Sequence, residues 1–473
     1  MCGGQKVYPV YVTPANITKS TRRKPSKRAM ALLGYLPVDA FEDVEDDEER
    51  RRLKADLVHR SLEIMLAPLK EASENGVDMW CPDRRLRRVY PMVAAYTADW
   101  PEQNLQSCTS EGSCPVCSTD WADRGSNEDP APMRDREETI DAILSYFLYK
   151  HRGALNDLHL KPVWPWWGDL PDVNLAECFT PDLLHQLYQG VFKTHVVRWL
   201  KHFVGADLLD ERFRAMPISA GMRHFSKGIT GVHQWTGRES KQMVSQILPV
   251  IAGELSVDMS RLIRAVIDFV FRAHASSMTD RDIDELEEDL RVFHELKGLL
   301  VEKGFYQSET RFNRIPKIHM LSHYAHFIRE MGTPDGYNTE APEQLHIEFA
   351  KVPWRASNKV RPLPQMLKYI QRQEAVRIHR AYLDRYMDML FGEADEPNEE
   401  EEEEWQDDQE EPTAEIGETI GESDELDVTG VEGVRAEGNE DSDSDEMPVS
   451  YPNPRRHMAL QALTGFRTAL FWG

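Results

Sequence analysis

The pattern of apolar and polar positions divides the chain into a strand-bearing N-terminal part and a long helical block. Val7–Val12 (VYPVYV) predicts a strand. Val89–Ala98 is mostly apolar, as expected for a strand covered on both faces. From Glu137 to about Glu330 apolar residues recur three and four positions apart, which predicts helices. Further helices are expected over about Glu45–Ser73 and about Pro364–Phe391.

The remaining segments show neither the two-residue alternation of a strand nor the 3.6-residue repeat of a helix. Lys19–Arg28 is a cationic stretch that predicts a loop, and Pro101–Pro132 is a Pro, Gly and Cys-rich loop. Beyond Glu393 the acidic tail cannot bury enough apolar surface to fold, so we expect it to be disordered.

The formal charge of -25 comes from one segment. Glu393–Glu446 holds 26 acidic residues and one basic residue, Arg435, which leaves 55 of each sign elsewhere. The rest of the chain, which has no net charge, can still present a basic groove, so the net charge does not exclude a nucleic-acid partner.

Composition also limits the compartment. No run approaches the roughly 20 apolar residues that span a bilayer, and the N-terminus lacks a signal-peptide pattern, so we expect an intracellular protein with no membrane partner. The cysteines are too few and scattered for a disulfide framework, and paired thiols are better explained by metal binding. They are Cys2, Cys81, Cys108, Cys114, Cys117 and Cys178.

A first candidate site contains cysteines and histidines. The two-residue gap between Cys114 and Cys117 lets both sulfurs reach one tetrahedral ion. His319 and His323 are spaced so that both imidazoles project from one helix face, and they are the best further ligands. Cys178 or His185 compete for the fourth position. The alternative is a turn with reduced thiols and an unrelated helix with ordinary histidines.

A second candidate site contains carboxylates. Asp99 follows the predicted strand Val89–Ala98, and strand ends suit the acidic groups that hold paired divalent ions in phosphoryl transfer. Glu340 and Glu343 are candidate partners from a distant segment. The alternative for each is a solvated turn residue.

Six strings in collinear order carry a family resemblance. The strings are YPVY (8–11), RRKPS (22–26), LGYLP (33–37), ADWPEQ (98–103), TPDLLHQL (180–187) and the segment 337–346, which begins YNTE. On these strings the chain resembles the Plavaka transposases of basidiomycete fungi, a branch of the CACTA-like cut-and-paste elements, from about residue 7 to about residue 375.

The resemblance implies a DNA transposon enzyme with a DDE nuclease. Its fold would be an α/β ribonuclease H-like core, incomplete here, interrupted by a large all-α insertion and followed by the disordered acidic tail. The implied domains are an N-terminal core part with the CxxC loop, a helical insertion, a C-terminal core part with the catalytic-type Glu, and the tail with a divergent end. Their ranges are 1–135, 136–330, 331–392 and 393–473.

The resemblance also assigns site residues. Asp99 corresponds to the second Asp of the triad. Glu343 is preferred as the catalytic Glu, although Gln344 stands where the wider group commonly has Arg, and Glu340 stays open. Asp182 and His185 form a DxxH pattern that either approaches the metal site or caps a helix. The quartet Cys114, Cys117, His319 and His323 corresponds to a structural Zn²⁺ site.

The start of the chain departs from this pattern. In the relatives the first Asp lies upstream of the VYPVYV-like strand, and Met1–Lys6 contain no carboxylate. We therefore expect an N-terminally incomplete transposase that is inactive as given, with Mg²⁺ or Mn²⁺ bound only if it is active. Tyr451–Gly473 has no counterpart in the family. The alternative is a non-catalytic, zinc-stabilised remnant that binds DNA or chromatin.

The expected partner is DNA, namely transposon ends, in the nucleus, with a homo-oligomer left open. Phosphate contacts would come from the cationic stretch, whose alternative is a solvated loop. Its basic residues are Arg22, Arg23, Lys24, Lys27 and Arg28. A third hypothesis, a scaffold that recruits basic partners through the acidic tail, depends on charge alone.

Overall fold

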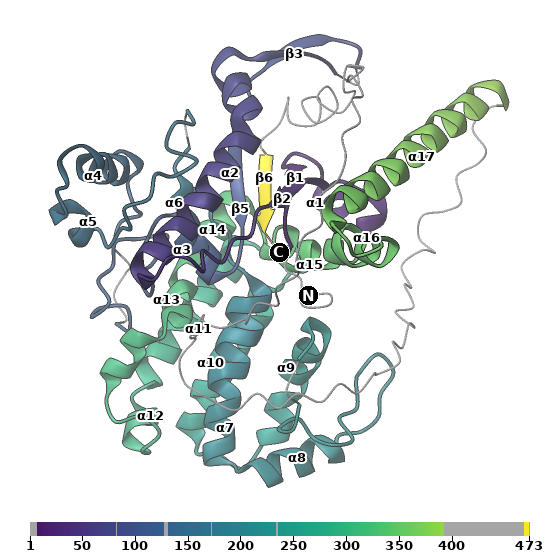
Figure 1. Ribbon diagram of the computed structural model, residues 1–473. Helices are drawn as coiled ribbons and strands as arrows, with labels where there is room; N and C mark the ends of the chain where they lie inside the picture. Colours follow the sequence, from purple (N-terminus) through teal and green to yellow (C-terminus); the bar gives the residue numbers. More distant parts are fainter. Residues whose placement is uncertain are drawn as a thin grey trace. The chain divides into compact units, whose positions relative to one another are not determined.

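The computed structural model describes residues 7–81, 83–126, 131–171, 173–232, 235–391 and 468–472. Two compact units are present, one of residues 1–370 with 454–473 and one of residues 371–453. The described residues are mostly helical and contain two small sheets (Figure 1). Most of the tail predicted to be disordered lies outside the described residues, and the predicted domain boundaries stay predictions.

The larger sheet has four strands in the order β2-β1-β6-β5. β1 pairs antiparallel with β2 and with β6, whereas β5 runs parallel to β6. The predicted first strand is confirmed. The long apolar run after it is divided, because Val89 ends β4 and Val93 begins β5. The bounds are β1 Tyr8–Pro14, β2 Ala31–Leu36, β5 Val93–Thr97 and β6 Thr468–Trp472.

β6 lies inside the sheet although it comes from the distant end of the sequence. Its backbone pairs Phe471 with Tyr11 of β1 and Ala469 with Ala95 of β5. β6 falls in the segment for which the resemblance offered no counterpart. β1 and β5 are therefore neighbours of β6 and not of each other.

Side chains cover both faces of this sheet because successive residues of a strand point to opposite sides. Val10 and Val12 of β1 belong to one buried cluster with Leu62 and Leu66 of α2 (Asp47–Asn75). Tyr11 points the other way, into a cluster formed with residues of α15, η6 and the start of α17. Those elements are α15 Glu340–His346, η6 Ile347–Lys351 and α17 Pro362–Phe391, with α16 Val352–Ala356 between them.

The second sheet is a hairpin of β3 (Val77–Trp80) and β4 (Leu86–Val89), which follows the end of α2 (Figure 1). α2 begins at Asp46, whose carboxylate accepts a hydrogen bond from the Glu49 backbone N–H at 2.7 Å. The helix predicted over Glu45–Ser73 is thus confirmed within two residues at each end.

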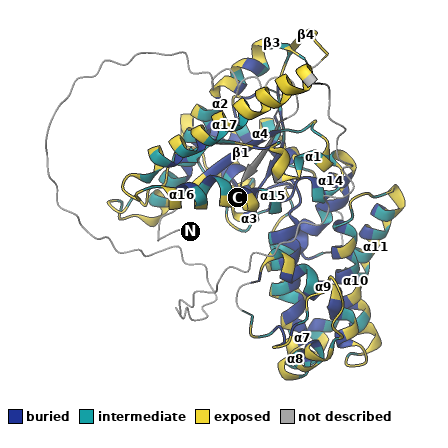
Figure 2. Ribbon diagram, turned by 90° about the vertical axis from the view of Figure 1, so that its right-hand side faces the viewer, coloured by how far each residue is buried: buried dark blue, intermediate teal, exposed yellow. Residues whose placement is uncertain are grey.

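The predicted helical block is confirmed. Leu262, Ile263, Val266, Ile267 and Val270 repeat at helical spacing in the sequence, and all five are buried in the largest core cluster. Figure 2 shows many buried residues among the helices of this block. The elements of the block are α4 Arg136–Tyr149, α5 Gly153–Asp157, α6 Leu175–Cys178, η2 Leu183–Val196, α7 Val197–Phe203, α8 Ala206–Ala215, α9 Gly237–Ile251, α10 Val257–Ala273, α11 Asp280–Leu296, α12 Leu299–Glu302, η3 Glu309–Arg314, α13 Pro316–His319, η4 Met320–His323 and α14 Tyr324–Met331.

Two predicted loops contain helices. Lys19–Arg28 holds α1 (Lys19–Arg22) and the 3-10 turn η1 (Pro25–Lys27). The segment after Asp99 begins with α3 (Trp100–Gln106), since Asp99 caps its N-terminus and Pro101 occupies its first turn. In the part of the chain that the structure describes, no helix is long and apolar enough to cross a membrane.

Candidate metal centre and carboxylate site

The structure brings the four predicted Cys and His ligands together. The ligand atoms of Cys114, Cys117, His319 and His323 lie within 4.8 Å of one another, and all four residues are buried. Cys114 Sγ is 3.4 Å from His323 Nε2, and Cys117 Sγ is 3.2 Å from His319 Nε2. Ligands about 2.0 to 2.3 Å from a tetrahedral ion are separated from each other by about 3.5 Å, so this donor set fits one such ion.

The surroundings favour one thiolate in this group. Hydrogen bonding with Cys114 and with both histidines holds the pKa of the Cys117 thiol well below its usual range, whereas burial raises the pKa of the Cys114 thiol. The histidines do not share one regular α-helix, as the spacing had suggested. His319 ends α13, and His323 ends the 3-10 turn η4.

Buried cations fix the loop that carries the two cysteines. Arg134 Nε donates to the Cys114 carbonyl at 2.8 Å, and its Nη1 donates to the Leu158 carbonyl at 2.7 Å. Further along the loop, the Gly125 N–H donates to Asn313 Oδ1 at 3.1 Å, and Lys297 Nζ donates to the Gly125 carbonyl. The loop is thereby attached to the helical block independently of any ion.

The two competing ligands lie outside this group. Cys178 Sγ contacts the Val93 carbonyl at 3.6 Å, and His185 is bonded to Asp182. Among the described residues, the group of four is the only cluster of three or more potential ligand atoms at this spacing.

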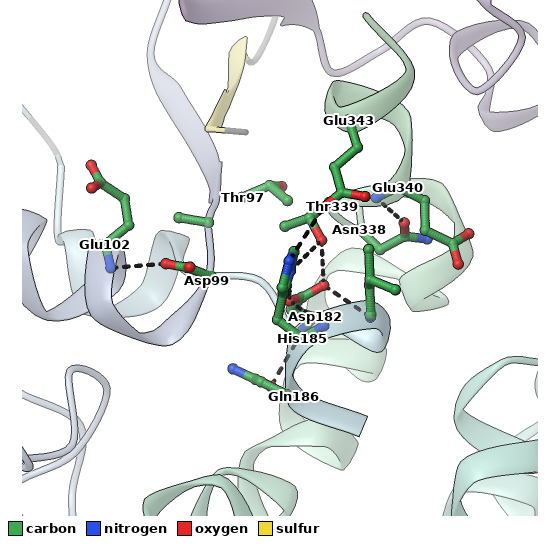
Figure 3. A network of polar contacts seen from close by, with 12 residues as sticks. Thr97, Asp99, Glu102, Asp182, His185, Gln186, Asn338, Thr339, Glu340 and Glu343 are labelled. Carbon is green, nitrogen blue, oxygen red and sulfur yellow. Dashed lines mark hydrogen bonds and ion pairs between the residues drawn. The ribbon is translucent and has the colours of Figure 1, made fainter. Parts of the chain in front are cut away.

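Asp99 stands where the sequence predicts it, just after β5. Its Oδ1 accepts a hydrogen bond from the Glu102 backbone N–H at 3.0 Å and so caps α3 (Figure 3). Burial raises the pKa of Asp99, and the nearby carboxylate of Asp182 adds to this, while His185 and Lys317 oppose it. Asp99, Asp182, His185 and Lys317 therefore share one electrostatic environment.

Asp182 arrives at this place because the segment before it follows β5. Tyr96 and Phe179 form a parallel bridge, so Asp99 and Asp182 each lie three residues beyond it in the same direction. Asp182 is fully buried and accepts hydrogen bonds from the His185 backbone N–H at 2.9 Å and from Thr339 Oγ1 at 2.7 Å. Burial alone would raise the pKa of Asp182, but these partners outweigh it and lower the pKa.

His185 joins Asp182 to Glu343. Its Nδ1 is 3.0 Å from Asp182 Oδ2, and its Nε2 is 3.2 Å from Glu343 Oε1. Burial by itself lowers the pKa of His185, but the two carboxylates outweigh it and raise the pKa to about 10. The imidazole is therefore protonated at neutral pH and connects η2 to α15 (Figure 3).

Glu340 has a different environment. Both of its oxygens pair with Lys241 Nζ, at 2.8 and 3.0 Å, and its carboxylate points away from His185 (Figure 3). Of the two glutamates, Glu343 is the one that reaches the Asp182–His185 pair. The catalytic roles of Asp99, Glu343 and Glu340 stay predictions.

A family model matches part of the chain. Residues 1–200 match the family model described as Plavaka transposase. This part of the chain is similar to the Plavaka transposases. The matched stretch includes β5, Asp99, both cysteines and the Asp182–His185 pair. No curated protein matches the chain.

The basic stretch of residues 22–28 is only partly exposed. Lys19 and Arg23 pair with Asp335 at 2.9 and 3.3 Å, and Arg28 pairs with Glu348. Arg22 donates to the carbonyls of Ala15 and Gly336 at 2.7 and 3.1 Å. Lys24 is exposed, and DNA binding by this stretch stays a prediction.

Sequence reasoning missed three polar side chains around the Asp182–His185 pair and the two glutamates. Thr339 donates to Asp182, Lys241 pairs with Glu340, and Lys317 Nζ donates to the His185 carbonyl at 2.9 Å. Thr339 lies within the matching string YNTE, so its position was a usable signal. The two lysines carry no pattern in the sequence.

Proposed function

We propose that this protein is a DNA transposase of the DDE type, whose carboxylates cleave and transfer DNA strands with divalent ions. The family match supports the transposase class. A mixed sheet covered on both faces, with Asp99 directly after β5, supports a ribonuclease H-like core. The proposal places the protein in the nucleus, acting on transposon ends.

One observation carries the catalytic part of the proposal. His185 contacts both Asp182 and Glu343, and the same imidazole and Asp182 influence the pKa of Asp99. Residues from three distant segments thus converge on one place: Asp99 after β5, the Asp182–His185 pair at the start of η2, and Glu343 on α15.

The side chains have separable roles in this proposal. Asp99 and Glu343 would hold Mg²⁺ or Mn²⁺, which supplies an activated attacking oxygen and stabilises the leaving oxygen. Asp182 fixes the orientation of His185, because it bonds to the ring, to the backbone and to Thr339. His185 keeps the Glu343 carboxylate directed toward the site.

The Cys/His group has a structural role in the proposal. Four buried donors leave no open position for a substrate, as is usual in structural Zn²⁺ sites. Zn²⁺ bound by Cys114, Cys117, His319 and His323 would join the loop after α3 to the segment just before α14 and hold the helical insertion on the core.

A nicking assay tests the catalytic proposal. The purified protein is incubated with supercoiled plasmid in Mg²⁺ or Mn²⁺. Asp99→Asn and Glu343→Gln are each expected to lower the nicking rate by at least about 100-fold, as when one transition-state contact is lost. Glu302→Gln, an exposed carboxylate on α12, is the matched control and keeps wild-type activity. Undiminished nicking by Asp99→Asn would sink the catalytic assignment.

The second candidate is a non-catalytic, zinc-stabilised DNA or chromatin binder. The observation in its favour is that Asp99 caps α3 and Glu343 is paired with His185, so both carboxylates already have partners within the protein. This candidate predicts DNA binding without nicking in either metal.

Glu340→Gln separates the two glutamates, since loss of nicking in that variant alone would move the catalytic role from Glu343 to Glu340.

A further inference from the structure

The β3–β4 hairpin has an unusual density of arginine that the proposed active site does not use. Residues 77–90 hold four arginines and two aspartates, a net charge of +2, whereas the whole chain outside the acidic segment 393–446 has no net charge. These residues are Arg84, Arg85, Arg87, Arg88, Asp78 and Asp83.

Two of the arginines are neutralised within the hairpin. Arg87 forms two hydrogen bonds to Asp83, at 2.7 and 2.6 Å, and Arg88 forms two to Asp78, at 2.9 and 3.2 Å. Pairs of this kind stiffen the ribbon, because Asp78 and Arg88 lie opposite each other in its register.

The other two arginines stand at the tip with their charges exposed. The Arg85 side chain is 78% exposed, and its Nε is 4.0 Å from Asp83 Oδ2. Arg84 is exposed, and within the described ranges its side chain has no hydrogen bond or ion pair. The net positive charge of the hairpin is therefore presented at its end.

The backbone at Arg84 favours a different residue. Arg84 has φ +61°, in a turn where its N–H donates to the Cys81 carbonyl and the Cys81 N–H donates to the Arg85 carbonyl, both at 2.9 Å. A left-handed residue closing such a tight hairpin is commonly Gly, since a Cβ costs about 1 kcal/mol or more there. Arg84 therefore occupies a position at which Gly would be less strained.

Aromatic side chains flank the charged tip. Trp80 is 73% exposed, and Tyr90 is 58% exposed. Trp80 lies opposite Leu86, so the ribbon presents an apolar edge beside its cations. A two-stranded ribbon is narrow enough to enter the major groove of duplex DNA, and guanidinium groups bind phosphates through paired N–H donors.

We propose that the β3–β4 hairpin is a contact to duplex DNA, in which Arg84 and Arg85 bind the phosphate backbone. The inference rests on the proposed action on DNA, but it concerns binding and not cleavage. It assigns the hairpin a role separate from the carboxylates and from the basic residues 22–28.

Anisotropy titration of the purified protein against a short fluorescein-labelled duplex, at several salt concentrations, tests this contact. Arg84→Gly/Arg85→Gln is expected to bind about ten-fold more weakly, and the slope of log K against log salt is expected to fall by about two. Arg84→Gly relieves the left-handed backbone, so thermal stability should be kept or raised. The charge-matched control is Arg261→Gln/Arg281→Gln, two exposed arginines on α10 and α11.

The outcomes separate this inference from the proposed function. Hairpin-dependent binding without nicking supports the contact and overturns catalysis. If the hairpin variant binds DNA with the affinity and salt slope of the wild type, the contact is overturned. The catalytic proposal is then still tested separately, by the nicking rates of the Asp99 and Glu343 variants. The hairpin contact is also overturned if the control variant loses as much DNA affinity as the hairpin variant. It is likewise overturned if the wild-type protein binds no duplex.

Discussion

His59 shows how a single buried residue sets a pH dependence. It lies on the inner face of α2 with 1% of its surface exposed. The Trp166 backbone N–H donates to Nδ1 at 3.3 Å, so Nε2 carries the proton and donates to the Leu105 carbonyl at 3.0 Å. Burial lowers the pKa of His59 to about 4, which keeps the ring neutral.

We predict that His59 makes the protein less stable in acid. Its folded pKa lies below the unfolded value of about 6.5, so the unfolded state binds more protons in this window, and stability falls as pH drops from about 6.5 to about 4. The contribution is roughly 3 kcal/mol at most. Urea unfolding at several pH values measures it. His59→Gln should show a shallower slope, and equal slopes for both proteins would refute the assignment.

Single residues differ in how far the sequence predicts them. Cys114 and Cys117 are close in sequence, at a spacing that lets both side chains reach one tetrahedral ion, and His319 and His323 form a similar short-range pair. The partner of Glu340, Lys241, is 99 residues away and has no such spacing. Contacts of this second kind depend on tertiary packing, which a local pattern does not encode.

The short helix α1 has a structural role that its composition hides. Lys19 and Arg23 pair with Asp335, and Arg22 reaches the Gly336 carbonyl, so α1 is attached to the turn η5 (Pro334–Gly336) that precedes α15. α15 carries Glu343. Charge alone predicted a DNA-binding stretch here and gave no sign of this internal attachment.

We predict that Arg22 and Lys24 respond differently to substitution. Arg22→Gln removes three hydrogen bonds to carbonyls and should lower the unfolding free energy by about 1 to 3 kcal/mol. Lys24→Gln should change it by less than about 0.5 kcal/mol and, if the stretch binds DNA, lower the salt slope by about one. Thermal melts and DNA titrations measure both effects. Equal melting temperatures for the two variants would contradict the structural role of Arg22.

Helices could be predicted from the sequence where the repeat of apolar residues continues over many residues. α2, α10 and α17 follow from their patterns, whereas the helix α3 was missed although Asp99 and Pro101 form a start signal. The sequence did not indicate that η2 is a π-helix, because its apolar residues are spaced as they would be in an ordinary α-helix.

At the scale of the whole molecule, the Cys/His group joins segments about 200 residues apart. Cys114 and Cys117 belong to the loop after α3, while His319 and His323 precede α14. An ion held by all four would close a long loop of chain, and long loops gain most in stability from such closure in the chain-entropy model.

We predict that this group binds one Zn²⁺. Cys114→Ser/Cys117→Ser should lose about one zinc per chain by elemental analysis and should melt at a lower temperature. Cys108→Ser is the matched control, because Cys108 is buried but lies outside the group, and it should retain the metal. Retention of zinc by the double variant would dismiss the site.

The position of β6 has a consequence for biosynthesis. β1, β2 and β5 are made early, yet among the described strands β1 and β5 are joined only through residues 468–472. At about 5 to 20 residues per second, the ribosome needs on the order of tens of seconds to travel from β5 to β6. During that interval the facing edges of β1 and β5 are open to other strands, so newly made chains should depend on chaperones until translation is complete.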